Sequence, residues 1–342
     1  MTVRVAVNGY GTIGKRVADA VARQPDMELI GVTKTRPNFE AVRAMDRGHP
    51  LYVAGKGGLE AFQAAGVKIA GTLEDLLKQV DVVVDCAPEG AGQENSELYR
   101  AAGVRSVYQG GEKSSVAEVS FNALANYAAA KGKERVRVVS CNTTGLSRAV
   151  SVLSPRYGVE SWEATIIRRA ADPAQSKKGP INGIMPTFHL PSHHGLDVRT
   201  IYPELPITTT AVIVPTTLMH VHVNHVRLAR PPSDLAPILA AFRETPRFVI
   251  FAPWEGIDGT PQAMEFARDR GAGQQDMMEN VLWEAGMRLD GPDLHFFQAI
   301  HQESIVVPES IDAIRSMMEL EPNAAASIAR TDKALGIRRT SG

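Results

Sequence analysis

The segment Gly9-Tyr10-Gly11-Thr12-Ile13-Gly14 constrains the fold more than any other part of the sequence. It has G-x-G-x-x-G spacing and stands between an apolar β-branched run at 3–7 and a helical pattern at 15–23. The first glycine permits a tight turn, the second lets the backbone approach a pyrophosphate, and the third allows close helix packing. The segment therefore predicts a strand, turn and helix that bind a dinucleotide at the helix N-terminus, with a purely structural turn as the alternative.

Short β-branched runs alternate with helical patterns along the first half of the chain. Strands are expected at 3–7, 29–33, 80–85 and 106–109. Residues 72–75 read Thr-Leu-Glu-Asp, a capping-box pattern that predicts the start of a helix. Such alternation is typical of a parallel sheet covered by helices. We therefore expect an α/β fold in which residues 1–140 form a Rossmann-type, doubly wound NAD(P)-binding domain.

The pattern changes after residue 140. Longer strands of a mixed or antiparallel sheet are expected at 162–168, 211–215, 220–228 and 247–251. Residues 170–203 are rich in Pro, Gly, Ser and His without a steady period, which indicates a long ordered loop. A last helical pattern covers 308–318 and can extend to 334. An α+β catalytic domain is therefore expected at 141–302, followed by a C-terminal helix within 303–342.

The composition is that of an ordinary globular protein, since 44% of the 342 residues are hydrophobic and 22% are charged. A formal net charge of -1 gives no general attraction to nucleic acid or to an anionic membrane. Cys86 and Cys141 lie in unrelated contexts, so a reducing compartment is expected rather than a disulfide framework. The N-terminus lacks a leader pattern and no apolar run reaches membrane-spanning length, so we expect a cytoplasmic protein.

Cys141 lies between an apolar β-rich run and a turn of small residues, in the order Ser140-Cys141-Asn142-Thr143-Thr144-Gly145. A thiol at a helix N-terminus meets backbone N–H donors that lower its pKa, and the thiolate is the species that attacks a carbonyl. A buried, inert cysteine is the alternative. Cys86 follows a buried strand and is expected to be packed, without chemistry.

A thiolate nucleophile needs a base, and the histidines gather in two places. His193 and His194 lie in the long loop, and His220, His222 and His225 lie in one strand. Period-two alternation puts His220 and His222 on the same face. A metal site is disfavoured, because this run has neither partner cysteines nor a carboxylate motif nearby. We therefore expect no metal, and a core or surface position is the ordinary alternative for each histidine.

The second strand ends in Thr33-Lys34-Thr35-Arg36, where an NAD-selective protein usually carries an acid. Two cations and two hydroxyls stand there instead, and these groups can accept a 2′-phosphate. We therefore expect NADP or dual use of NADP and NAD, with Lys34 and Thr35 among the contacts. Solvated loop charges are the alternative for Lys34 and Arg36.

Several blocks carry a resemblance to a known family. They are Asn8 to Gly14, Thr33 to Thr35, Gln109-Gly110-Gly111-Glu112-Lys113, Ser140 to Leu146, Pro191-Ser192-His193-His194-Gly195, Pro215 to His220 and His301-Gln302-Glu303-Ser304. Together they resemble the phosphorylating glyceraldehyde-3-phosphate dehydrogenases of archaeal type, from Val3 to about Gly336. In the bacterial and eukaryotic branch the cysteine is followed by Thr-Thr-Asn, whereas here the order is Asn142-Thr143-Thr144, so sites are not transferred from that branch.

The resemblance implies the reversible oxidation of glyceraldehyde 3-phosphate to 1,3-bisphosphoglycerate, a step of glycolysis and gluconeogenesis, with NAD(P) as cofactor and inorganic phosphate as co-substrate. It implies a thiohemiacetal and then a thioester on the cysteine, a terminal helix that returns to the first domain, and a homotetramer. The residues it assigns are Cys141 as nucleophile, His220 as base, Ser140, Asn142, His193 and His194 around the substrate, and Gly111, Arg169 and Gln302 at the cofactor.

Two phosphate groups must be held, and both need cations and donors. Thr143 and Thr144 offer hydroxyls beside the nucleophile, and Arg168, Lys177 and Lys178 lie in or beside the long loop. Strand alternation would face Arg168 and Arg169 in opposite directions. For each of Arg168, Lys177 and Lys178, a solvated surface charge is as good an interpretation as a phosphate ligand.

Two other classes of protein stay open. A semialdehyde dehydrogenase of the same architecture would also use a cysteine and an acyl phosphate, but the Pro-Ser-His-His block and the phosphate-suited cations disfavour it. A non-catalytic nucleotide-binding or RNA-binding protein is disfavoured by the near-neutral charge and by the presence of Cys141 and His220.

Overall fold

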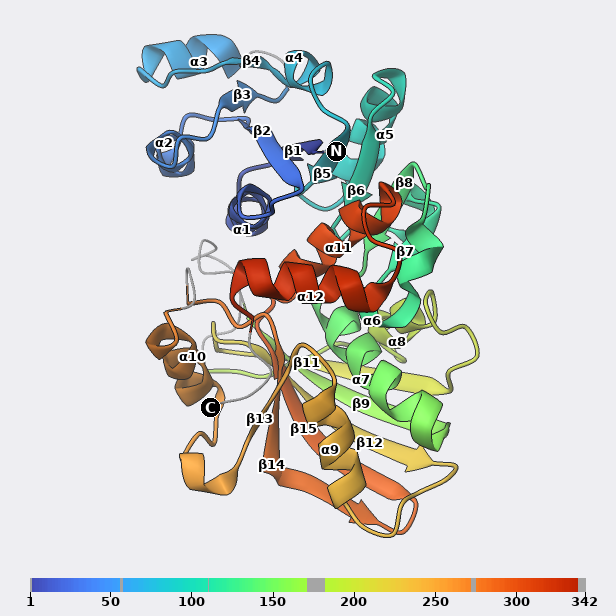
Figure 1. Cartoon of the computed structure of the whole chain (residues 1–342). Helices are drawn as coiled ribbons and strands as arrows, with labels where there is room; N and C mark the ends of the chain where they lie inside the picture. The colour runs from blue at the N-terminus through green and yellow to red at the C-terminus, as the bar shows by residue number, and fades with distance from the viewer. Residues whose placement is uncertain (1, 56–57, 110, 171–181, 272–274, 338–342) are drawn as a thin grey trace. The chain divides into compact units, whose positions relative to one another are not determined.

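The computed structural model describes residues 2–55, 58–109, 111–170, 182–271 and 275–337. They form two compact units, each with its own sheet (Figure 1). The first contains the residues up to Ser140 together with Val306–Leu335, and the second contains Cys141–Ile305.

The first unit is built on an eight-stranded sheet with the order β4-β3-β2-β1-β5-β6-β8-β7. Every pairing in it is parallel. This confirms the doubly wound α/β fold expected for the N-terminal part. The strands are β1 (Val3–Asn8), β2 (Met27–Lys34), β3 (Leu51–Val53), β4 (Gly71–Thr72), β5 (Val82–Asp85), β6 (Arg105–Tyr108), β7 (Val119–Phe121) and β8 (Arg135–Val138).

The helices of the first unit follow the strands in alternation, as the sequence pattern predicts. Thr72 and Asp75 form the expected capping box, in which each side chain accepts a hydrogen bond from the other residue's backbone N–H. The helices of the N-terminal segment are α1 (Thr12–Ala22), α2 (Phe39–Asp46), α3 (Gly58–Ala64), α4 (Leu73–Leu77), α5 (Ala91–Ala101) and α6 (Ala123–Asn126), with 3-10 turns at Ser114–Val116 and Tyr127–Ala130.

The C-terminal segment forms two helices, α11 (Val307–Met317) and α12 (Ala324–Leu335). The helix expected over 308–318 is confirmed, but its extension to 334 as the same helix is wrong. The break contains Glu319 with a φ of 53° and Pro322, which disfavours helical backbone at the residue before it.

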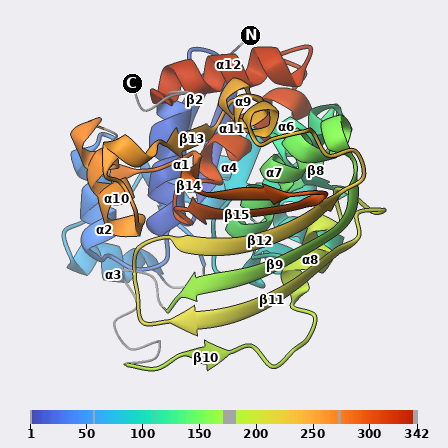
Figure 2. The same ribbon diagram turned by 90° about the horizontal axis from the view of Figure 1, so that it is seen from below.

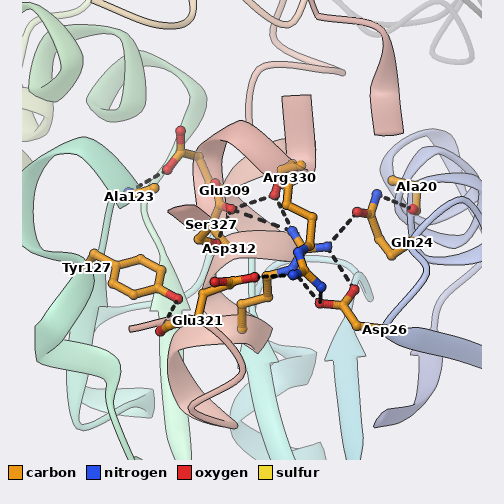
Figure 3. A network of polar contacts seen from close by, with 12 residues as sticks. Ala20, Gln24, Asp26, Ala123, Tyr127, Glu309, Asp312, Glu321, Ser327 and Arg330 are labelled. Carbon is orange, nitrogen blue, oxygen red and sulfur yellow. Dashed lines mark hydrogen bonds and ion pairs between the residues drawn. The ribbon is translucent and has the colours of Figure 1, made fainter. Parts of the chain in front are cut away.

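Buried polar contacts hold both helices in the first unit (Figure 3). The fully buried Arg315 guanidinium donates to both carboxylate oxygens of Asp26 at 2.8 Å. Asp312 accepts from Ser327 and Thr331 at 2.6 Å each, which ties α11 to α12. The carboxylate of Glu309 accepts from the backbone N–H of Ala123 at 2.7 Å, so α11 is also bound to the start of α6.

The second unit is built on a seven-stranded sheet with the order β10-β11-β9-β12-β15-β14-β13 (Figure 2). The β11–β9 and β13–β14 pairs are parallel and the others antiparallel, which confirms the expected mixed sheet. The strands are β9 (Val159–Arg169), β10 (Met185–Pro186), β11 (Ile207–Val214), β12 (His220–Leu228), β13 (Phe248–Phe251), β14 (Asn280–Asp290) and β15 (Asp293–Ile300).

The helices of the second unit are α7 (Cys141–Tyr157), α8 (His193–Val198), α9 (Ala236–Glu244) and α10 (Thr260–Asp269), with a 3-10 turn at Pro253–Glu255. The expectation that 170–203 form one long ordered loop is wrong in part, because its described residues contain β10 and α8. Residues 171–181, which include Lys177 and Lys178, lie outside the described residues. Within the described chain, no helix is long and apolar enough to cross a membrane.

Candidate functional site

The glycine turn between β1 and α1 has the geometry of a dinucleotide-binding turn. Gly9 has a φ of 99°, a conformation that favours glycine. A Cβ at Gly14 would stand 1.9 Å from the carbonyl oxygen of Gly9, so this position admits no side chain. A Cβ at Gly11 would meet no atom within 4 Å, so that side of the turn is open to an approaching group.

The N-terminus of α1 suits an anion. Gly11 is its N-cap and makes no side-chain cap, and the first turn carries no acid. The backbone N–H groups that begin at Thr12 and Ile13 are therefore oriented as donors for a phosphate, with the favourable end of the helix dipole behind them. The open side at Gly11 and this set of donors fit the pyrophosphate of a dinucleotide.

A buried polar network supports the turn from beneath. Thr33 Oγ1 accepts from the backbone N–H of Gly9 at 3.0 Å and donates to Asn8 Oδ1 at 2.6 Å. Asn8 Nδ2 in turn donates to the hydroxyl of Tyr99 at 2.6 Å, and that hydroxyl donates to Asp85 at 2.5 Å. The Thr33 hydroxyl thus holds the turn, and the expectation that it accepts a 2′-phosphate is wrong.

An acidic residue six positions further along the chain, Glu40, pairs with Lys34 at the end of β2. Lys34 Nζ donates to Glu40 Oε2 at 2.7 Å, and Lys15 Nζ lies 3.7 Å from Glu40 Oε1. Burial acts to raise the pKa of Glu40, but the contacts with Lys34, Asn38 and Lys15 together outweigh it, and the pKa is lowered. The carboxylate comes from the first turn of α2, so the view that no acid stands near the end of β2 is wrong. Thr35 is exposed beside this pair.

Cys141 is the first residue of α7, as the sequence pattern predicts. Burial raises the pKa of its thiol to about 11. The backbone N–H of Asn142 and the charges of Arg168 and Arg169 act in the opposite direction but are smaller in effect. The expected lowering of the pKa is therefore wrong for the unliganded protein, because desolvation of the thiolate outweighs the helix N-terminus.

His220, at the start of β12, is buried, and its pKa is well below the ordinary value because of that burial. Its Nδ1 accepts from the backbone N–H of Arg169 at 3.0 Å. A backbone N–H only donates, so the neutral ring carries its proton on Nε2. His220 therefore offers an N–H donor, and acting as the expected base would require the loss of its bond to Arg169.

His222 is excluded as the base by its surroundings. It is fully buried, and both ring nitrogens are hydrogen-bonded, Nε2 to Asn142 Oδ1 and Nδ1 to Gln298 Nε2, each at 2.9 Å. Burial lowers its pKa to about 3. Gly145 lets α7 come this close to the sheet, since a Cβ there would stand 2.8 Å from Ile300 Cγ2.

A buried chain of polar contacts around Glu303 follows the last strand. Arg169 lies 3.2 Å from Glu303, and the other oxygen of that carboxylate lies 2.9 Å from His301 Nε2. Burial alone would raise the pKa of Glu303, but the His301 and Arg169 contacts lower it to about 2. This role of Glu303 was not predicted from the sequence, in which its position in a His-Gln-Glu-Ser block was the available signal.

Gln302, beside this chain, is nearly fully buried, and neither its amide oxygen nor its amide nitrogen has a hydrogen-bond partner. A buried amide without a protein partner is suited to hydrogen-bond a polar ligand.

Of the two arginines at the end of β9, Arg169 is the buried one and Arg168 is half-buried, as strand alternation predicts.

The expected substrate residues belong to two elements. His194 is buried in α8 with Nδ1 3.1 Å from Ser192 Oγ, and burial lowers its pKa to about 3. His193 is exposed and its ring stacks on that of His194 with centroids 4.0 Å apart. The Thr143 hydroxyl donates to the Asp197 carboxylate at 2.6 Å and so links α7 to α8. The expectation that this hydroxyl donates to a phosphate is therefore wrong.

Two further predicted site residues, Ser140 and Gly111, lie in the first unit. Ser140 is its last residue before α7 and is half-buried. Gly111 is exposed, and a Cβ there would make ordinary contact with Glu89 at 3.6 Å. Among the described residues, no group of three or more His, Cys, Asp or Glu side chains could hold a metal ion.

Similarity to known proteins extends over both units. A family model described as "Glyceraldehyde 3-phosphate dehydrogenase, C-terminal domain" matches residues 140–272. A model described as "Dihydrodipicolinate reductase, N-terminus" matches residues 3–120, which contain the glycine turn.

Curated relatives named glyceraldehyde-3-phosphate dehydrogenase match nearly the whole chain. The protein of Archaeoglobus fulgidus is 51% identical over 339 residues, which cover 98% of this chain and 98% of the relative. The protein of Hyperthermus butylicus is 50% identical over 336 residues, which cover 98% of this chain and 97% of the relative. The protein of Methanothermus fervidus is 46% identical over 334 residues, which cover 97% of this chain and 98% of the relative. With a glycine turn suited to a dinucleotide in one unit and a helix-terminal cysteine in the other, the chain belongs to the glyceraldehyde-3-phosphate dehydrogenase family, in its archaeal form.

Proposed function

We propose that this protein catalyses the NAD(P)-dependent phosphorylating oxidation of D-glyceraldehyde 3-phosphate to 1,3-bisphosphoglycerate, with Cys141 as the nucleophile. The observation that carries the proposal is the position of Cys141 at the N-terminus of α7, within the electrostatic reach of Arg168 and Arg169, in a chain of this family. Cations and helix N–H groups favour the anionic form of the sulfur, which is the attacking species.

The residues that would hold the cofactor are the glycine turn with Thr12 and Ile13, and by resemblance Gly111, Arg169 and Gln302. The open side of the turn at Gly11 and the unpartnered amide of Gln302 support this assignment. When bound, NAD(P) supplies the acceptor for the hydride that leaves the substrate carbon.

The protein's own groups account for the rest of the reaction. The thiol proton passes to water, the Cys141 sulfur forms a bond to the aldehyde carbon, and the carbonyl electron pair moves onto oxygen. His220 stabilises the resulting oxyanion with a hydrogen bond from its Nε2–H and keeps that proton, as the tautomer selected by Arg169 allows. When the oxyanion electron pair re-forms the carbonyl, the carbon–hydrogen bond breaks, the hydride leaves the carbon, and a thioester is left on the Cys141 sulfur. An oxygen of inorganic phosphate then bonds to this carbon, the carbon–sulfur bond breaks, and the thiolate of Cys141 returns.

Ser140, Asn142, His193 and His194 would bind the substrate. His194 is neutral at pH 7, because burial lowers its pKa to about 3, and it serves as a hydrogen-bonding group rather than a cation. The charge of the substrate phosphate is then met by Arg168, whose Nε is buried without a hydrogen-bond partner.

We propose dual use of NADP and NAD, governed by the Lys34–Glu40 pair. Lys34 attracts a 2′-phosphate, whereas the Glu40 carboxylate repels it and can accept from a ribose 2′-hydroxyl. Replacing Glu40 by Gln keeps the size and removes the charge, so the ratio of kcat/KM for NADP to that for NAD should rise about tenfold. Lys34→Met should lower the ratio, and an unchanged ratio in both variants would refute this assignment.

Initial rates with glyceraldehyde 3-phosphate, phosphate or arsenate, and each cofactor test the reaction itself. The proposal requires reduction that depends on phosphate, its loss in Cys141→Ser with cofactor affinity retained, and a roughly 100-fold lower kcat in His220→Asn, which lacks the Nε2 donor. Reduction without phosphate would contradict it, and reduction with a semialdehyde alone would favour that rival class. Cofactor or RNA binding without any reduction would favour a non-catalytic protein.

The resemblance also leads us to propose a cytoplasmic homotetramer. Light scattering of the purified chain should give four times the monomer mass, and a monomer at micromolar concentration would contradict this.

A further inference from the structure

A chain of buried polar side chains runs through the second unit to the residue after Cys141. Its members are Arg148 and Asn142 in α7, Asn280 in β14, Gln298 in β15 and His222 in β12, and all are at least 97% buried. Consecutive members lie 3.4, 3.0, 2.9 and 2.9 Å apart, from the Arg148 guanidinium to the Asn142 amide.

The direction of every hydrogen bond in this chain is determined by its first donor. Arg148 only donates, and it donates to Met278 O and to Asn280 Oδ1. Asn280 Nδ2 then donates to Gly145 O at 2.8 Å and to Gln298 Oε1 at 3.0 Å. With its oxygen occupied, Gln298 donates from Nε2 to His222 Nδ1. His222 must therefore carry its proton on Nε2 and donate to Asn142 Oδ1 at 2.9 Å.

The hydrogen bonds between these polar side chains cannot reverse their direction at neutral pH. His222 is fully buried and neutral, since burial holds its pKa at about 3. Reversal would face two donors against each other at Gln298 or at Asn280, at a cost that a buried site does not recover. The oxygen of Asn142 is thus held against His222, and the Nδ2 group lies on the other side of the amide.

We propose that Arg148, Asn280, Gln298 and His222 form a positioning chain that orients Asn142 so that its Nδ2–H group donates to the oxygen of the adduct on Cys141. The inference rests on the proposed function. It makes Asn142 a second donor beside His220 for the same oxygen, and it makes His222 a positioning residue rather than a base. A rigid donor of this kind acts where negative charge develops.

Asn142→Asp tests the donor without disturbing the chain, because it keeps an oxygen for His222 and replaces only the amide nitrogen. Removal of one oxyanion donor typically lowers kcat about 100-fold or more. We expect that loss in kcat with unchanged affinity for NAD(P). A kcat within about threefold of the parent would overturn the proposal.

His222 is tested by a double-mutant cycle with Asn142. His222→Leu should lower kcat at least about tenfold in the parent and have no further effect in Asn142→Ala, because it acts through that amide. His222→Gln, which can donate from a position close to Nε2, should recover most of the loss. His225→Leu on the same strand is the matched control and should keep the parent kcat. Equal losses in both backgrounds would overturn the positioning role.

The two levels of the proposal fail in different ways. A parent chain without phosphate-dependent reduction refutes the proposed function itself. A fully active parent in which Asn142→Asp is also fully active refutes the positioning chain alone. If His222→Leu does not fold, the Asn142→Asp measurement still decides.

Discussion

Replacement of Glu303 by Gln should destabilise the second unit by an amount that depends on pH. The carboxylate lies 3.2 Å from Arg169 and 2.9 Å from His301, and its side chain is 4% exposed. Burial, which raises its pKa, is outweighed by these partners, and the pKa falls from 4.5 to about 2. At 1.36 kcal/mol per pH unit this displacement corresponds to about 3 kcal/mol of stability at pH 7.

The sign follows from the lowered pKa. A carboxyl with a lower pKa in the folded state contributes its full stability above the unfolded value of 4.5 and loses it as pH falls toward 2. The difference between parent and Glu303→Gln should therefore be about 3 kcal/mol at pH 7 and roughly half of that near pH 3.

Urea unfolding followed by tryptophan fluorescence measures this difference directly. The three tryptophans, Trp162, Trp254 and Trp283, all lie in the second unit, so the signal reports on the unit that contains Glu303. Glu160→Gln is the matched control, because Glu160 pairs with Arg227 at the surface and such pairs are worth little. A difference below about 1 kcal/mol at pH 7, or one that does not shrink at lower pH, would refute the reasoning.

The same substitution should change the nucleophile. The charge of Glu303 raises the pKa of Cys141, so its removal should lower that pKa and speed alkylation by iodoacetamide at pH 8. An unchanged alkylation rate would mean that the charge of Glu303 does not reach the sulfur.

Three further outcomes are expected. Gly14→Ala should prevent correct folding of the glycine turn, because the added Cβ meets protein atoms. Gly11→Ala should leave the melting temperature unchanged, because its Cβ meets none, and should weaken dinucleotide binding at least about tenfold, because the Cβ stands on the open side of the turn. Calorimetry of both variants checks this, and equal destabilisation would contradict it. Arg315→Met should cost about 3 kcal/mol in chemical unfolding, because the buried Asp26 carboxylate loses both hydrogen bonds from that guanidinium and keeps only the longer contact with Arg330 at 3.5 Å; a loss within about 1 kcal/mol would show that Arg330 or water replaces Arg315. Alkylation of Cys141 in the free protein should accelerate roughly 100-fold from pH 7 to 9, because its thiol pKa is about 11; a plateau below pH 8 would indicate a preformed thiolate.

Local patterns identified much of the architecture because they depend on neighbours in the chain. The positions of β1, β2, β5 and β6 in the first unit, the capping box at Thr72 and the start of α7 at Cys141 follow from periodicity, short-range hydrogen bonds and small-residue turns. The short strands β3, β4 and β7 and the β14–β15 hairpin were missed, as was the break between α11 and α12. In the second case an apolar helical pattern continues past the point where Glu319 and Pro322 end the helix.

The protonation states could not be obtained in the same way. A helix-terminal cysteine indicates a lowered pKa, but the burial that raises it to about 11 comes from residues brought together by folding. In the same way, the choice between His220 and His222 turned on Arg169 and Gln298, which lie on neighbouring strands and far away in the sequence.

The sequence by itself determined the two fold classes, the glycine turn and the position of Cys141 at the start of a helix, because each is encoded by residue types at short spacing. Only the tertiary structure decided which groups face one another. Folding places Glu40 beside Lys34, and it engages the hydroxyls of Thr33 and Thr143 in structural hydrogen bonds. It also determines the direction of the hydrogen bonds in the buried polar chain that ends at Asn142. The physical reason is that pKa values, tautomers and hydrogen-bond direction depend on burial and on partners distant in sequence, which a linear pattern does not contain.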